Sequence, residues 1–167
     1  MLLGTVTSTG YRIVLALHLL AVIVGFGSVL LNGVYASKAR RRGGAEGAAI
    51  AEANAEISFG VSMWFVYAII IFGFALVGMS SKAIKFSQTW VWLSVALYVV
   101  IIGLVHGVHR PNVRRLDELM RQGTAGDREE MERRERLAAT IGGVLIVLVV
   151  VVVFLMVLKP GGLRSGI

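Results

Sequence analysis

The stretch that decides the fold is the 22-residue apolar run from Leu137 to Leu158, LAATIGGVLIVLVVVVVFLMVL. An α-helix needs about 20 apolar residues to cross the roughly 30 Å hydrocarbon layer of a membrane, so this run is long enough to cross once. Backbone amides in lipid must be hydrogen-bonded within their own segment. An uninterrupted apolar run of this length therefore predicts a transmembrane helix.

Three further stretches have the same character: Ile13–Tyr35, Ile57–Ser81 and Phe86–His109, with 23, 25 and 24 residues. All 17 basic and 10 acidic residues lie outside the four stretches, and 56% of the chain is hydrophobic. The longest polar stretch, Arg110–Arg136, is too short to build a soluble core of its own. We therefore expect an all-α fold, a four-transmembrane-helix bundle that forms one integral membrane domain over residues 1–167.

Positive charge is distributed unevenly between the two sides of this bundle. Twelve of the 17 Lys and Arg residues follow the first and third spans. The other five are on the opposite face: Arg12, Lys82, Lys85, Lys159 and Arg164. The positive-inside rule then predicts an N-out/C-out protein of the cell inner (cytoplasmic) membrane, with both long loops in the cytoplasm. Because membrane topology accounts for the basic charge, we expect the lipid bilayer as the surroundings and no nucleic-acid partner.

The two long loops carry helical signals. Ala45–Glu56 is alanine-rich and predicts a helix that leads into the second span. Pro111 can begin a helix in which Val113, Leu116 and Met120 recur at helical spacing, so we expect a short amphipathic cytoplasmic helix on the membrane surface. Three Glu-to-Arg pairs at i,i+4 predict a cytoplasmic extension of the fourth helix: Glu129–Arg133, Glu130–Arg134 and Glu132–Arg136.

The uncharged polar residues of the spans are the candidates for function, because polar groups at membrane depth tend to face the bundle interior. In the first span, His18, Ser28 and Asn32 fall on one face of small or polar residues. In the third span, Ser94 and Tyr98 are the corresponding interior polar residues. The chain has no cysteine, which excludes disulfides, thiolate metal sites and thiol catalysis. We assign no catalytic residue.

Three histidines raise the question of haem or another metal, since neutral imidazole is the usual nitrogen ligand. His18 lies well inside its span, where we expect a hydrogen bond to Ser94 or Tyr98; the alternatives are an axial bond to haem b and a proton or substrate role. His18 and His106 are on the order of 20 Å apart along the membrane normal, too far to ligate one iron. His106 and His109, at i,i+3, share a helix face where they could hold a metal, relay protons or hydrogen-bond water and headgroups.

Four short runs give the chain a resemblance to a known family: Leu17–Leu20, Gly25–Ser28, Phe86–Trp92 and His106–Pro111. Together they resemble a bacterial family of small predicted integral membrane proteins, numbered 2269 among the domains of unknown function, which implies four helices. More distantly, a histidine in the first of several helices looks like the membrane protoporphyrinogen oxidase and copper-resistance D type families. The residue that matches is His18, and that resemblance implies haem or metal handling.

Three classes of function remain. The first is a non-catalytic accessory or scaffold subunit of a larger membrane complex, such as a respiratory one, since the spans have no embedded acid–base pair. Its partners would be other membrane protein subunits or further copies of the chain. The second is a membrane redox protein that binds haem b through His18. The third is a small transporter, which the absence of charged and proline-broken spans disfavours.

Overall fold

The computed structural model describes residues 6–81, 83–122 and 128–160, and is helical with no strand in those ranges. Lys82 and Arg164, which count toward the expected orientation, lie outside the described residues. In chain order the elements are α1 (Thr9–Arg42), α2 (Gly44–Glu56), η1 (Ile57–Ser62), α3 (Met63–Met79), α4 (Thr89–Leu104), η2 (Val105–His109), α5 (Arg110–Gln122) and α6 (Arg128–Leu158), where η marks a π-helical segment.

These elements join into four helices that are long and apolar enough to cross a membrane: Thr9–Arg42, Gly44–Met79, Thr89–Leu116 and Arg128–Leu158. The four spans predicted from the sequence are therefore confirmed. Each helix is longer than its apolar stretch because charged turns continue it without a break. The helix expected over Ala45–Glu56 is present and runs through η1 into α3.

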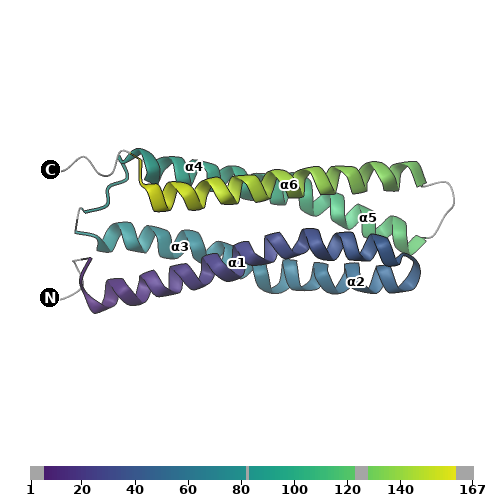
Figure 1. Ribbon diagram of the computed structural model, residues 1–167, viewed down its shortest axis with the longest axis horizontal. Coiled ribbons are helices and arrows are strands. Elements are labelled where there is room, and N and C mark those ends of the chain that lie inside the picture. Colours follow the sequence, from purple (N-terminus) through teal and green to yellow (C-terminus); the bar gives the residue numbers. More distant parts are fainter. Residues whose placement is uncertain (1–5, 82, 123–127, 161–167) are drawn as a thin grey trace.

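The helical segment after the third span differs from the expectation in one respect. The short amphipathic helix expected from Pro111 is present as α5, and its place on the membrane surface stays a prediction. What was not expected is that α5 follows η2 directly and continues the line of α4 (Figure 1). Pro111 is the second residue of α5 and has no backbone N–H to donate. The π-helical segment η2 just before it has wider i→i+5 turns, so the helix continues past the proline without that hydrogen bond. The third long helix therefore resembles the other three.

A tight turn joins α1 to α2. Gly43 and Gly44 have positive φ angles of 61° and 52°, which glycine adopts without a steric penalty. Gly47 then lies so close to α1 that a β-carbon there would be 2.5 Å from the carbonyl oxygen of Ala39. The glycines therefore allow two long helices to run antiparallel in close contact.

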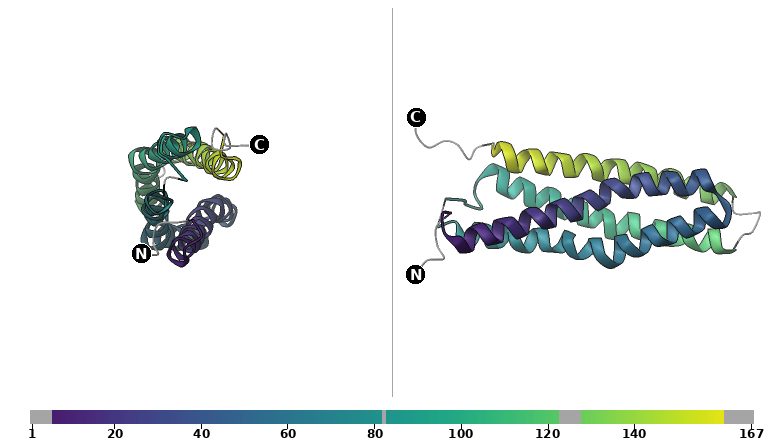
Figure 2. Two further views of the ribbon diagram at one scale, coloured as in Figure 1. Left: turned by 90° about the vertical axis from the view of Figure 1, so that its left-hand side faces the viewer. Right: turned by 60° about the horizontal axis from the view of Figure 1, so that its bottom comes forward.

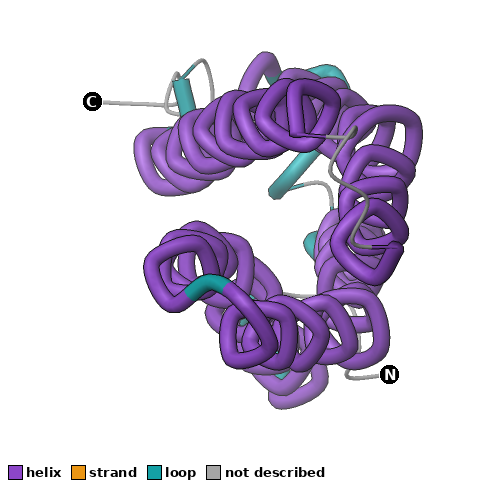
Figure 3. Tube along the Cα trace, turned by 90° about the vertical axis from the view of Figure 1, so that its right-hand side faces the viewer, coloured by secondary structure: helices purple, strands orange, loops and turns teal. Residues whose placement is uncertain are grey.

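The helices form two groups, which Figure 1 shows as two layers. In one group α1 packs against α3 and α2, and in the other α6 packs against α4 and α5. The start of α1 and the end of α6 lie at the same end of the molecule, as an even number of spans requires (Figure 1). Viewed along the axis, the helices form an arc (Figures 2 and 3), and α1 and α6 at its two ends also contact one another.

The buried core is small for the size of the helices. Nine apolar residues form it: Ala21, Phe26, Val66, Ile69, Tyr98, Ile101, Leu145, Val149 and Val152. In each span no more than 22% of the most apolar 18-residue window is buried. Because large apolar surfaces are not stable in water, lipid or other protein must cover the remainder.

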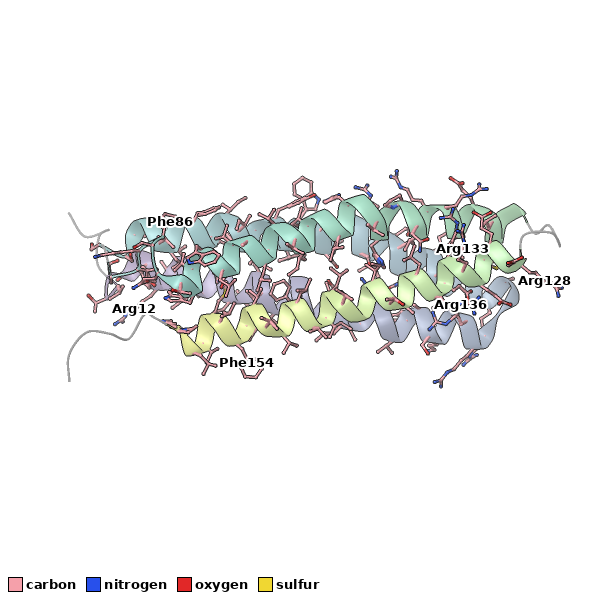
Figure 4. All side chains as sticks on the ribbon, turned by 90° about the horizontal axis from the view of Figure 1, so that it is seen from above. Arg12, Phe86, Arg128, Arg133, Arg136 and Phe154 are labelled. Atoms are coloured by element: carbon pink, nitrogen blue, oxygen red, sulfur yellow. The ribbon has the colours of Figure 1, made fainter. Side chains whose placement is uncertain are left out.

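The two ends of the molecule differ in charge. Figure 4 shows Arg128, Arg133 and Arg136 at one end and Arg12 with the apolar Phe86 and Phe154 at the other. At the first end, here called the charged end, two of the three predicted i,i+4 pairs are formed: Glu130–Arg134 at 2.8 Å and Glu132–Arg136 at 3.6 Å. The opposite end, where α1 begins and α6 ends, is called the termini end.

Candidate functional site

His18 is the most deeply buried titratable residue of α1, with 6% of its surface exposed. Its ring lies against Gly73 of α3, where a β-carbon would be 3.5 Å from Cε1. The carbonyl group of Ile69 is its polar neighbour. Nδ1 is buried and has no hydrogen-bond partner. The glycine therefore leaves room for a buried imidazole with one unused nitrogen.

The hydrogen bond expected from His18 to Ser94 or Tyr98 is not formed. Ser94 is buried, but its hydroxyl donates to the carbonyl oxygen of Trp90 at 2.7 Å, one turn earlier in its own helix. The hydroxyl of Tyr98 donates to the carbonyl oxygen of Val66 on α3. Serine often bonds back to its own helix in this way, because the acceptor is always within reach. Both residues face the interior, yet each already has another partner.

Asn32 and Ser28, the remaining predicted interior polar residues, are partly buried. The hydroxyl of Ser58 lies 2.7 Å from Oδ1 of Asn32 and 2.6 Å from the carbonyl oxygen of Asn54. The hydroxyl of Ser28 donates to the carbonyl oxygen of Gly25 at 2.7 Å. The Asn32–Ser58 contact thus joins α1 to η1, whereas Ser28 serves only its own helix.

The closest contact between titratable side chains in the spans joins Tyr67 of α3 to His106 of η2. The phenol oxygen lies 2.7 Å from Nε2, and the two rings are parallel with centroids 6.1 Å apart. Trp64, one turn earlier, meets Tyr67 edge-on at 6.5 Å and is 73% exposed. Tyr67 was missed from the sequence because a lone tyrosine in an apolar run is typical of core packing or of an interface anchor.

His106 and His109 have different surroundings, and a shared metal or a proton relay between them stays a prediction. They share a face only if the helix is regular, but they lie in the π-helical segment η2, whose wider turns separate residues three apart. His106 is occupied by Tyr67, whereas Nδ1 of His109 is buried without a partner. Among the described residues, no three His, Cys, Asp or Glu side chains are grouped to hold a metal ion.

The two imidazoles of interest contact α3 at different levels. His18 lies at Gly73 and His106 at Tyr67, six residues earlier, which is about 9 Å along a helix axis. All ten acidic residues of the sequence lie in 46–56 and 117–135, outside this region. The chemistry available inside the spans is therefore that of imidazole, phenol and hydroxyl groups, without a carboxylate to act as base.

A family model described as predicted integral membrane protein, DUF2269, matches residues 12–160. No curated protein and no solved structure matches the chain.

Proposed function

The chain belongs to the DUF2269 family of predicted integral membrane proteins, and from that premise we propose that it is a non-catalytic subunit or helical scaffold of a larger membrane assembly. The observation that carries the proposal is that the hydroxyl groups inside the spans are hydrogen-bonded within the protein. Ser94, Tyr98 and Ser58 all bond to backbone carbonyls or to a neighbouring helix. The bonds of Tyr98 and Ser58 join one helix to another, as in packed transmembrane bundles. No carboxylate lies inside the apolar spans to act as a base.

The surface of the bundle supports association with other helices. At several glycines of the spans, a β-carbon would have no atom within 4 Å apart from the two chain neighbours and the nearby backbone of the same helix: Gly27, Gly33, Gly103, Gly107, Gly142 and Gly143. Small residues at the surface of transmembrane helices allow another helix to approach closely. The partner is another membrane subunit or a second copy of this chain.

The proposal includes the membrane and the orientation. The excess of Lys and Arg after the first and third spans favours an N-out/C-out protein of the cytoplasmic membrane. The charged end then lies in the cytoplasm, where α2, α5 and the first turns of α6 extend beyond the lipid and can meet soluble parts of a partner.

Purification from the native membrane in a mild detergent tests this proposal. We expect the chain to elute with stoichiometric partner chains, identified by mass spectrometry, or as a defined homo-oligomer. The preparation should also give an absorbance spectrum. A pure monomer without pigment would contradict the proposal and would favour the small transporter, which a liposome flux assay then tests.

A second candidate function rests on the unused nitrogen of His18. The buried imidazole with an unpartnered Nδ1 is the observation that supports an axial ligand. Gly73 of α3 lies against this side of the ring, so a bound haem would need α1 and α3 to move apart. Bound haem b would supply one-electron redox chemistry, while His18 would bind the iron and the surrounding apolar side chains would exclude water.

The spectrum of the purified protein tests the haem candidate. We expect a Soret band that is lost in His18→Ala and kept in His109→Ala, which removes a second buried imidazole with an unpartnered nitrogen. A folded, colourless wild-type protein would rule the candidate out, and so would equal loss of the band in both variants.

A further inference from the structure

The termini end carries positive charge without any acidic residue. By sequence, no Asp or Glu occurs in 57–116 or in 137–167, so the ten acids all belong to the charged end. Arg12, Lys85 and Lys159 are basic residues of the termini end that the structure describes. Among the described residues none of the three forms an ion pair with Asp or Glu, so this positive charge is open to an anionic partner.

Trp90 lies at this end, in the first turn of α4. Its side chain is only 8% exposed, and its indole Nε1 is buried with no hydrogen-bond acceptor. A buried indole N–H in a folded protein usually has a partner, because leaving it unpaired costs free energy. The indole therefore offers a hydrogen bond that nothing in the described chain accepts.

Lys159 places a cation beside this indole. It follows the last residue of α6, which packs antiparallel to α4, and its ammonium nitrogen is 5.7 Å from the centroid of the Trp90 ring. The backbone N–H of Lys159 donates to the carbonyl oxygen of Leu155 at 2.9 Å, and this hydrogen bond holds the backbone of Lys159 against the end of α6. Lys159 is exposed, so Trp90 is the buried part of the site and Lys159 the part open to the membrane surface.

The start of α4 adds peptide N–H groups to the same place. The first amides of a helix have no partner inside it, and they carry a partial positive charge. The N-cap residue Gln88 makes no side-chain bond to them, because its Oε1 accepts from the backbone N–H of Lys85 at 3.2 Å. The backbone N–H groups of Val91 and Trp92 donate to the carbonyl oxygen of Gln88 at 3.0 and 3.3 Å, which leaves those of Thr89 and Trp90 at the start of the helix. The Lys159 ammonium and the indole N–H of Trp90 lie at this same end of the molecule.

We propose that this cluster, called the Trp90–Lys159 site, binds the headgroup phosphate of an anionic phospholipid. Phosphate has several acceptor oxygens and a negative charge, so one group can accept from the ammonium and from N–H donors together. Tryptophan is enriched at the depth of the lipid headgroups, and lysine side chains reach the same depth. An anionic lipid is favoured over a zwitterionic one because the latter carries its own cation into a region that already has a positive excess.

Native mass spectrometry of the full chain in mixed micelles tests the proposal, with phosphatidylglycerol and phosphatidylcholine added in equal amounts. We expect the wild type to retain phosphatidylglycerol preferentially. Lys159→Gln should lower this preference about tenfold, the size expected for one charge-assisted hydrogen bond. Trp90→Phe, which keeps the ring but removes the N–H, should lower it severalfold.

Lys85→Gln is the matched control, since it removes the same charge from an exposed residue at the same end. It should leave the preference within about twofold of the wild type, because diffuse surface charge is screened by salt. Equal retention of both lipids by the wild type would overturn the proposal. An effect of Lys85→Gln as large as that of Lys159→Gln would also overturn it, since general attraction would then explain the result.

Inorganic phosphate distinguishes a lipid from a free anion. We expect millimolar phosphate to leave the retained phosphatidylglycerol in place, because the acyl chains add apolar contacts that the free anion lacks. Complete displacement would show that the site selects phosphate alone and would overturn the lipid assignment. The experiment uses the isolated chain, so its outcome is independent of whether partner subunits co-purify.

Discussion

At the scale of single residues, the contact between Tyr67 and His106 links the two groups of helices. Tyr67 belongs to α3, and His106 belongs to the helix that runs from α4 to α5. Tyr98 makes the second link, from α4 back to the carbonyl oxygen of Val66. A tyrosine hydroxyl lies far from its own backbone. Tyr67 and Tyr98 can therefore bridge α3 and the α4–α5 helix although the two backbones are not in close contact.

We predict that Tyr67→Phe weakens the bundle, because the ring remains while the hydrogen bond to His106 is lost. Hydrogen bonds between transmembrane helices contribute about 0.6 kcal/mol on average. The melting temperature in detergent, followed by circular dichroism, should therefore fall by a few degrees. Tyr35→Phe is the control, since Tyr35 is 46% exposed. Equal melting temperatures for the two variants would contradict the prediction.

The glycine of the first hairpin leads to a second prediction at this scale. A β-carbon at Gly47 would be 2.5 Å from the backbone oxygen of Ala39, which cannot rotate away. Gly47→Ala should therefore push α1 and α2 apart and lower the melting temperature. Gly33→Ala, in an open part of α1, should be neutral or stabilising because alanine is the better helix former by about 1 kcal/mol. The reverse order of the two variants would refute a close α1–α2 contact.

At the scale of elements, a buried polar contact fixes α5 against α6. Asn112, only 4% exposed, donates from Nδ2 to the carbonyl oxygen of Arg134 at 2.9 Å. Arg134 in turn donates to Oδ1 of Asn112 at 3.3 Å and to Glu130 at 2.8 Å. Because a polar side chain is satisfied in only one alignment, this contact sets how the two helices are positioned along each other.

The carboxylate of Glu130 gives this contact a pH dependence. Its hydrogen bond with Arg134 lowers the pKa of Glu130, and the charges of Arg134, Arg115 and Arg133 act in the same direction. A lowered pKa in the folded state means that the stabilisation is present above the ordinary carboxyl pKa and is lost as the pH falls through the lowered value.

We therefore predict that the melting temperature of the wild type falls on acidification from about pH 6 to about pH 3 more steeply than that of Glu130→Gln. The neutral amide cannot titrate, so the variant should lose this part of the pH dependence. Glu46→Gln is the control, because Glu46 forms an exposed i,i+4 pair with Arg42 at the same end. Parallel pH profiles for the wild type and Glu130→Gln would show that the Glu130 pair does not contribute.

At the scale of the whole molecule, the two ends are chemically distinct and lie at opposite ends of the long helices (Figure 4). The absence of cysteine makes the proposed orientation directly testable, since every introduced thiol is unique. Ser87→Cys places an exposed thiol at the termini end, and Ala45→Cys places one at the charged end. In intact cells, a membrane-impermeant maleimide should label the first and not the second.

Permeabilised cells provide the control for this labelling, because both thiols should then react. Labelling of Ala45→Cys alone in intact cells would reverse the orientation. The positive-inside argument would then be wrong for this chain, while the fold would stand unchanged. The Trp90–Lys159 site would also keep its residues, and only the leaflet that supplies its lipid would change.

The fold was largely predictable, but the site was not. Long apolar stretches specify helices because each backbone amide in lipid has to find its partner within the same helix. The short helix after the third span was predicted, but its continuity with α4 was not, because nothing in the residue pattern indicates the π-helical segment before Pro111. The partners of Ser94, Tyr98 and His106 could not be read from spacing, since each depends on which helix lies opposite.

The sequence by itself determined that this protein has four transmembrane helices, an acid-free interior and two ends of different charge. These properties follow from residue type and from the local hydrogen bonding of a helix, which need no knowledge of the neighbours. Only the tertiary structure decided that Tyr67 meets His106, that His18 has no partner for Nδ1, and that Lys159 lies beside Trp90. Such contacts join residues distant in the chain, and side-chain packing between helices selects them.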